Sequence, residues 1–212
     1  MLWTATVIII SYLVGSIPTA YIFGRVIKGV DIRKFGSGNV GATNAMRLLG
    51  KKIGVTVLLL DILKGFLAVF ILGNLFKNRG LLPRDAFLIM LGVAVICGHN
   101  WTVFLSFKGG KGIATTFGVL IAFACNIPGL NIILGLTILT WLVSFLISRI
   151  VSASSVIAAI SLPIYMAVFK QPRLMLYATM LLSAFVILRH KANLVRLFKG
   201  EEKRLTFGKN PR

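Results

Sequence analysis

Acidic residues and metal-binding side chains are scarce in this chain. Its 212 residues include five Asp or Glu, two His and two Cys. These few potential ligands show no metal-binding spacing, so we expect neither a metal site nor another cofactor. Cys97 and Cys125 both lie in apolar runs, and no disulfide framework is expected from them.

Polar linkers and low-complexity segments are also missing, which predicts a single domain over residues 1–212. Long uncharged runs are present instead: 57% of the residues are hydrophobic and the mean hydropathy is +0.91. Values this high are typical of membrane proteins. We do not expect a cleavable signal peptide, because no Lys or Arg precedes the first apolar run and that run is too long.

Seven apolar segments are candidates for membrane spans, since about 20 such residues cross the hydrocarbon layer. The uncharged stretch 112–148 is too long for one span, and the turn-forming residues 126–129 divide it. Its first half, 112–125, is the weakest candidate. The other segments are 2–24, 53–76, 86–107, 150–169 and 174–188. The sequence therefore predicts an all-α integral membrane protein with about seven transmembrane helices.

The 24 Lys and Arg residues indicate how such a protein is oriented. With the amino terminus outside and seven spans, the inner segments hold 18 basic residues and the outer loops hold five. This asymmetry follows the positive-inside rule. A basic inner face also attracts lipid headgroups and anionic metabolites. Nucleic-acid binding is not expected, because there is no platform of alternating aromatic and basic residues.

The stretch GSGNVGATN, residues 36–44, begins with the pattern G-x-G-x-x-G, and Asp61 follows 20 residues after the third glycine. A dinucleotide site needs a strand before the glycines, whereas an apolar membrane segment precedes them here, and Asp61 lies in mid-span. Glycines can still direct backbone N–H groups at an anion beside a helix amino terminus. A plain turn is the alternative, but Arg47 and the donors Ser37, Asn39, Thr43 and Asn44 favour an anion site.

A second glycine-rich stretch, SFKGGKGIAT, covers residues 106–115 and lies on the same predicted inner face. Lys111 stands between Gly110 and Gly112, which again describes an anion site opening a helix. Lysines at span ends are commonly anchors, and we interpret Lys108 in that way. Lys111 is the better functional candidate.

A third polar cluster, RHKANLVR, occupies residues 189–196. If the preceding helix continues, His190, Asn193 and Arg196 share one face. A basic anchor at the end of a span would explain the cations, but it would not require His190 or Asn193.

Two charges interrupt an apolar segment, Asp61 and Lys64, at i, i+3 spacing. Each costs about 2.5–3.5 kcal/mol inside a bilayer, so we expect a structural pair, with Lys64 near an aqueous cavity as the alternative. His99 is interpreted as a buried, hydrogen-bonded histidine or a packing residue.

Together these clusters resemble the acyl-phosphate-dependent glycerol-3-phosphate acyltransferases of bacteria, the PlsY family. The similarity lies in GSGNVGATNAMR at 36–47, GHNWTVFLSFKGGKGIATTFG at 98–118 and RHKANLVRLFKGEE at 189–202. The resemblance implies an inner-membrane enzyme with seven helices, whose glycine-rich cytoplasmic loops form the active site. It would move an acyl group from acyl phosphate to the 1-hydroxyl of glycerol 3-phosphate, the first step of phospholipid biosynthesis. The H-x4-D pattern of other glycerolipid acyltransferases is absent.

The resemblance also implies roles for individual residues. Ser37, Arg47 and Lys111 would contact phosphate, while His190 and Asn193 would help to hold glycerol phosphate. Ser152 would add a polar contact. The remaining expected binding residues are Gly36, Gly38, Asn39, Val40, Gly41, Ala42, Thr43, Asn44, Gly109, Gly110 and Gly112. Membrane lipid and an enzyme that produces acyl phosphate are the expected partners.

The chemistry needs two anions held together and a hydroxyl aligned with a carbonyl, which cations and N–H groups can achieve. No Ser-His-acid relay is evident, so we expect direct attack without an acyl-enzyme. The alternative is a transporter of an organic phosphate or another anion, because glycine-broken helices also occur in transporters. Every candidate residue is predicted on one membrane face, which favours the enzyme.

Overall fold

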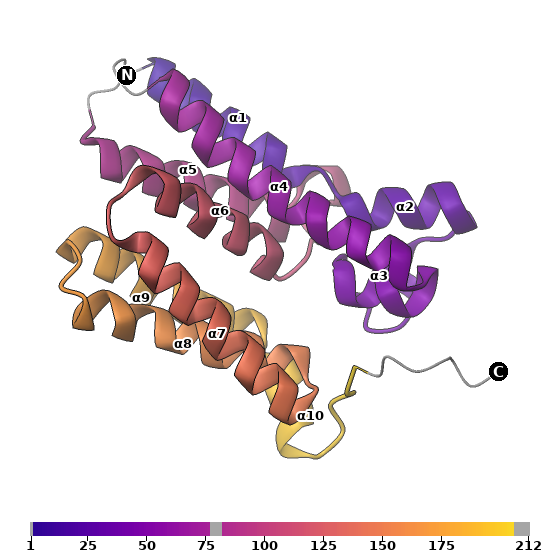
Figure 1. Cartoon of the computed structure of the whole chain (residues 1–212). Helices are drawn as coiled ribbons and strands as arrows, with labels where there is room; N and C mark the ends of the chain where they lie inside the picture. The colour runs from indigo at the N-terminus through magenta and orange to yellow at the C-terminus, as the bar shows by residue number, and fades with distance from the viewer. Residues whose placement is uncertain (1, 77–81, 206–212) are drawn as a thin grey trace. The chain divides into compact units, whose positions relative to one another are not determined.

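The computed structural model describes residues 2–76 and 82–205 as an arrangement of helices without a strand (Figure 1). It divides into two compact units, residues 1–130 and 131–212, and each is considered by itself. The expectation of a single domain stays a prediction. Four basic residues used in the orientation count lie outside the described residues: Lys77, Arg79, Lys209 and Arg212.

The first unit contains α1 (Leu2–Ser16), α2 (Thr19–Lys28), α3 (Ala42–Leu49), α4 (Lys51–Leu75), α5 (Arg84–Asn100) and α6 (Ile113–Asn126). Helix α4 packs along α6, and α1 packs along α5. Glycines bring the first pair together: a Cβ on Gly65 would lie 2.2 Å from the Thr115 carbonyl oxygen. A Cβ on Gly118 would similarly lie 1.9 Å from the oxygen of Ile62. Small residues at such contacts let membrane helices approach backbone to backbone.

A break at Ile17 and Pro18 divides the first apolar segment into α1 and α2. Proline lacks a backbone N–H and cannot continue the hydrogen-bond ladder. The ammonium group of Lys64 in α4 donates to the Ile17 carbonyl at 2.9 Å, and it also pairs with Asp61 at 2.8 Å. The predicted pair of Asp61 and Lys64 is confirmed.

The second unit contains α7 (Leu130–Ser148), which starts at the boundary, then α8 (Val151–Val168), α9 (Arg173–Arg189) and α10 (Lys191–Phe198). Helices α8 and α9 pack together. The α10 axis is bent by 60° from that of α9. The two form a broken segment rather than one continuous helix.

Five helical segments are long and apolar enough to cross a bilayer, and a sixth is added if the bent pair α9–α10 counts as one span. Helix α6, with 14 residues, is shorter. Each apolar segment found in the sequence is helical, the first of them as two helices, so the expected all-α membrane architecture is present. The count of seven complete spans stays a prediction.

Candidate functional site

The first glycine loop joins the 3-10 turn η1 (Ile32–Lys34) to α3. Gly36 and Gly38 have φ angles of 60° and 69°, which glycine adopts without strain. Asn44 is buried beneath the loop, and its amide donates to the carbonyls of Ile32 at 3.3 Å and Phe35 at 3.0 Å. Its Oδ1 accepts from the Ser37 N–H at 3.1 Å. Asn44 therefore fixes the conformation of the loop backbone through these hydrogen bonds. Its contact with substrate stays a prediction.

The amino end of α3 offers donors of the predicted kind. Gly41 is the N-cap and has no side chain to cap the helix, so the N–H groups of Ala42 and Thr43 lie in a first turn where no helix carbonyl can accept them. Ser37 in the loop and Arg47 in α3 are both exposed. Val40 is different, because its side chain lies in the apolar cluster under the loop. Only the backbone of Val40 could face a ligand.

An ion pair that sequence analysis missed supports this loop. The Arg33 guanidinium donates to both carboxylate oxygens of Asp31, at 3.0 Å and 2.7 Å. This pairing outweighs burial and lowers the pKa of Asp31 to about 2. Arg33 also donates to the Leu105 carbonyl at 3.5 Å, which links the first glycine loop to the segment before the second. The short spacing D-x-R was the available signal.

The second glycine segment folds back onto the end of α5. The N–H of Gly109 donates to the Asn100 carbonyl at 3.1 Å, and that of Gly110 donates to the His99 carbonyl at 3.0 Å. These two N–H groups are thus engaged within the protein, and their predicted contact with substrate stays a prediction. Gly112, with a φ angle of 82°, is the N-cap of α6 and has no side-chain cap. Lys111 lies half-buried between these elements.

Glu202 organises the polar residues of the second unit. It accepts from the Asn193 amide at 2.5 Å, the Ser152 hydroxyl at 2.8 Å and Arg196 Nε at 2.7 Å. Burial alone would raise the pKa of Glu202, but these hydrogen bonds outweigh it and hold the pKa below its ordinary value. Sequence analysis placed Glu202 only at the edge of the third motif. Its role depends on a chain reversal after α10 that no periodicity reveals.

His190 lies at the junction of α9 and α10, so the helix does not continue straight through it, and the condition for His190, Asn193 and Arg196 to share one face is not met. Helix α9 ends at Arg189, His190 caps it, and α10 begins at Lys191 with the 60° bend. His190 is buried, and its Nδ1 lies 2.8 Å from the Val186 carbonyl. A carbonyl can only accept, so Nδ1 carries the proton in the neutral ring and Nε2 is the basic nitrogen.

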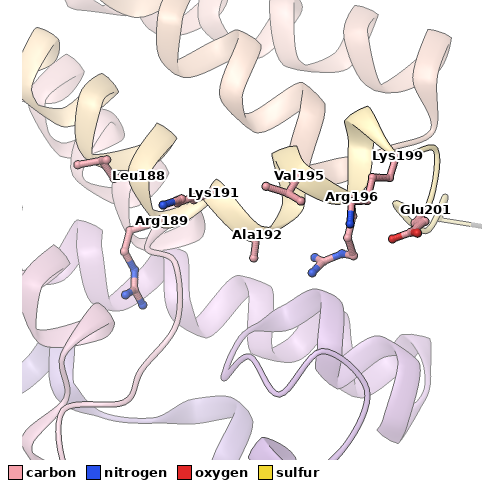
Figure 2. A pocket seen from close by; sticks show the side chains of 8 residues that line it. All are labelled: Leu188, Arg189, Lys191, Ala192, Val195, Arg196, Lys199 and Glu201. Atoms are coloured by element: carbon pink, nitrogen blue, oxygen red, sulfur yellow. The ribbon is translucent and has the colours of Figure 1, made fainter.

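A hollow of about 590 Å³ opens along α10 (Figure 2). Four cationic side chains, one carboxylate and apolar side chains surround it. Its lining residues are Leu188, Arg189, Lys191, Ala192, Val195, Arg196, Lys199 and Glu201. Such a surface is suited to anions. No group of three His, Cys, Asp or Glu side chains suited to a metal occurs in residues 2–76 and 82–205.

Comparison with known proteins adds an independent observation. The family model described as "Glycerol-3-phosphate acyltransferase" matches residues 5–200. The chain belongs to the glycerol-3-phosphate acyltransferase family. This family consists of acyltransferases of phospholipid synthesis, and the chain is an integral membrane member of it.

Similar family members come from more than one organism. A glycerol-3-phosphate acyltransferase of Desulforamulus reducens is 43% identical and covers 94% of each chain. That of Chlorobaculum tepidum is 38% identical over 99% of each chain. A crystal structure of PlsY (YgiH), an integral membrane glycerol 3-phosphate acyltransferase in its glycerol 3-phosphate form, is 39% identical, with a TM-score of 0.84 over 96% of each chain. Its lysophosphatidic acid form gives a TM-score of 0.81 over 96% of this chain and 95% of that chain.

Each unit carries a separate part of the predicted site. In the first unit, Arg33 joins the loop that carries Ser37 to the segment that leads to Lys111. In the second unit, Glu202 joins Asn193 and Ser152. The family assignment agrees with the resemblance seen in the sequence, while the contact roles of individual residues remain predictions.

Proposed function

We propose that this protein transfers a fatty acyl group from acyl phosphate to the 1-hydroxyl of glycerol 3-phosphate, giving 1-acyl-glycerol 3-phosphate and inorganic phosphate. The match that carries the proposal is the similarity to the glycerol 3-phosphate form of PlsY along nearly the whole chain. The acyl phosphate donor is what the resemblance to the PlsY family implies. Phosphate is already a good leaving group, so no activating nucleophile is needed on the protein.

The residues have complementary roles in this proposal. The first glycine loop and the amino end of α3 hold the phosphoryl end of the acyl donor through backbone N–H groups, with Ser37 and Arg47 beside them. Lys111 contacts phosphate from the second segment. His190 and Asn193 hold glycerol 3-phosphate. Ser152 adds a polar contact next to them, because it shares the Glu202 carboxylate with Asn193. Fixed cations and N–H groups offset the repulsion of the two substrates.

The reaction step is direct attack of the substrate hydroxyl on the acyl carbonyl carbon. The new ester C–O bond forms as the bond between the carbonyl carbon and the phosphate oxygen breaks. The hydroxyl proton passes to a substrate phosphate oxygen or to Nε2 of His190. Alignment of the two reactants can supply about 7–11 kcal/mol of the lowering of the barrier.

The location of the enzyme belongs to the same proposal. The resemblance implies a bacterial inner membrane protein, and the excess of Lys and Arg in the segments assigned to the inner face supports an orientation with the amino terminus outside. Both glycine segments then face the cytoplasm, where glycerol 3-phosphate and an enzyme that produces acyl phosphate would be available.

The deciding experiment supplies the purified protein with palmitoyl phosphate and glycerol 3-phosphate. We expect release of phosphate and formation of 1-acyl-glycerol 3-phosphate. Parallel reactions in which acyl-CoA or acylated acyl carrier protein replaces palmitoyl phosphate should give no product. Transport of glycerol 3-phosphate into vesicles without acylation would overturn the proposal, and an acyl group trapped on Ser37 or a cysteine would overturn the direct mechanism.

A further inference from the structure

A buried polar cluster in the first unit lies outside the residues assigned to substrate. Asp61 is 1% exposed, and its Oδ1 accepts from the Thr19 hydroxyl at 2.6 Å. Lys64 Nζ lies 2.8 Å from the same oxygen, and His99 Nδ1 lies 3.6 Å from it. Ionisable groups within membrane helices are costly and commonly serve function, so this convergence calls for an explanation.

The cluster joins α4 to the two helices that precede the glycine segments, α2 and α5. Thr19 is the first residue of α2, which leads to the first glycine loop, and Lys64 donates to Ile17 in the break before it. His99 is the second-last residue of α5, the helix that precedes the second segment. If Asp61 served only to neutralise a charge, Lys64 would be a sufficient partner. The additional contacts with Thr19 and His99 connect Asp61 to both of these helices.

The His99 ring is also the support on which the second segment rests. A Cβ placed on Gly110 would lie 2.1 Å from His99 Nε2, so ring and glycine backbone are in close contact. The Gly110 N–H donates to the His99 carbonyl at 3.0 Å. Gly110 directly precedes Lys111. A shift of the His99 ring would therefore move the backbone that carries this lysine.

We propose that Asp61 is a positioning residue for the acyl transfer reaction. Its carboxylate orients the His99 ring, and the ring fixes residues 109–112 so that Lys111 presents its ammonium group to phosphate. The role of Lys111 rests on the proposed function. The support that Asp61 and His99 give to the glycine segment does not.

The test removes both buried charges together, because a lone Lys64 charge would be strongly destabilising. In D61N/K64Q, we expect hydrogen exchange at the Gly109 and Gly110 amides to become about 10-fold faster. The KM for the substrate whose phosphate Lys111 contacts should rise by about 10-fold or more, since small misplacements of binding groups have large kinetic effects. Exchange is followed by mass spectrometry of peptides that cover residues 101–113.

Ser11→Ala is the matched control, because Ser11 is buried in the same unit and donates to the Leu91 carbonyl between α1 and α5. It should lower Tm without changing exchange at residues 109–110 or any KM. Thr19→Val is a milder second variant that keeps both charges. It should change exchange in the same direction, and it decides the question if D61N/K64Q does not fold.

Faster exchange together with a raised KM would support the proposal. Unchanged exchange at residues 109–110 would overturn it, and faster exchange with every KM unchanged would overturn the link to Lys111. If the wild-type protein releases no phosphate from palmitoyl phosphate and glycerol 3-phosphate, the proposed function is wrong. The exchange rates then still decide whether Asp61 supports the glycine segment.

Discussion

At the residue scale, carboxylates in this chain serve mainly to hold cations in place. Asp31 pairs with Arg33, Asp61 with Lys64 and Glu202 with Arg196, each at 2.7–2.8 Å. Since basic residues outnumber acidic ones by 24 to 5, these pairs leave a large cationic excess. That excess suits a protein whose proposed substrates are both phosphorylated.

Arg47→Ala and Lys111→Ala should each lower kcat/KM for phosphate release by about 100-fold or more, the usual effect of removing a charged donor from a transition-state site. Folding should be preserved, since Arg47 is exposed and Lys111 is half-buried. Arg84→Ala is the matched control. This exposed arginine contacts Asn74 and Asn126 at the carboxyl ends of α4 and α6, whereas the glycine segments lead into the amino ends of α3 and α6. Wild-type kcat/KM in either site variant would contradict the phosphate contact.

Glu202→Gln should weaken the three hydrogen bonds that its carboxylate accepts. We expect a loss of about 1–3 kcal/mol in the free energy of unfolding, because a charge-assisted network loses its charge. The KM for glycerol 3-phosphate should also rise, since Asn193 loses its fixed partner. Asp85→Asn, in the first turn of α5 and outside the predicted site, is the control. Equal stability and equal KM in the two variants would show that Glu202 has no organising role.

The depressed pKa of Asp31 predicts how stability depends on acid. The folded value is about 2 and the ordinary value is 3.8, so the stabilising contribution is fully present above about pH 4. It should be lost as the pH falls from about 4 to 2, because the unfolded state then binds a proton more readily. The Tm difference between the wild type and Asp31→Asn should shrink over this interval. A constant difference would contradict the pairing.

At the scale of elements, each glycine segment depends on a polar residue that fixes its backbone. Asn44 ties the first loop to the amino end of α3, and His99 receives the second segment at the end of α5. The glycines are needed for close approach as well as for unusual φ angles. The close approach of Gly110 to His99 is the clearest case.

Gly110→Ala should disturb the second segment, because its Cβ would lie 2.1 Å from His99 Nε2. We expect kcat/KM to fall by about 10- to 100-fold, a typical effect of a shift of about 1 Å near a site. Gly135→Ala in α7 is the matched control, since nothing lies within 4 Å of its Cβ and alanine favours a helix by about 1 kcal/mol. Full activity of Gly110→Ala would show that the segment tolerates the added carbon.

At the scale of the whole molecule, the distribution of charge makes a prediction about orientation. In a background without Cys97 and Cys125, Ser37→Cys and Lys108→Cys should react with a membrane-impermeant thiol reagent only after the membrane is opened. Lys170→Cys, in a predicted outer loop, should react in intact cells. Labelling of Ser37→Cys and Lys108→Cys from opposite sides would exclude a common site for the two glycine segments.

Much of the architecture could be predicted from the sequence because it follows from local composition. Apolar runs specify membrane helices wherever they occur, since an unpaired backbone in lipid is too costly. The helix that begins within GSGNVGATN, the buried pair of Asp61 and Lys64, and the family motifs also depend on neighbouring residues. For these features, periodicity and spacing were sufficient.

Other features were decided only by the tertiary structure, because they depend on contacts between residues far apart in the chain. Glu202 meets Ser152 from 50 positions away, and Arg33 reaches Leu105 from 72 positions away. The 60° bend between α9 and α10 at His190 was likewise not indicated by the sequence pattern. A sequence states which groups are available, but hydrogen bonds act over about 3 Å. Only the folded chain determines which of those groups come within that distance.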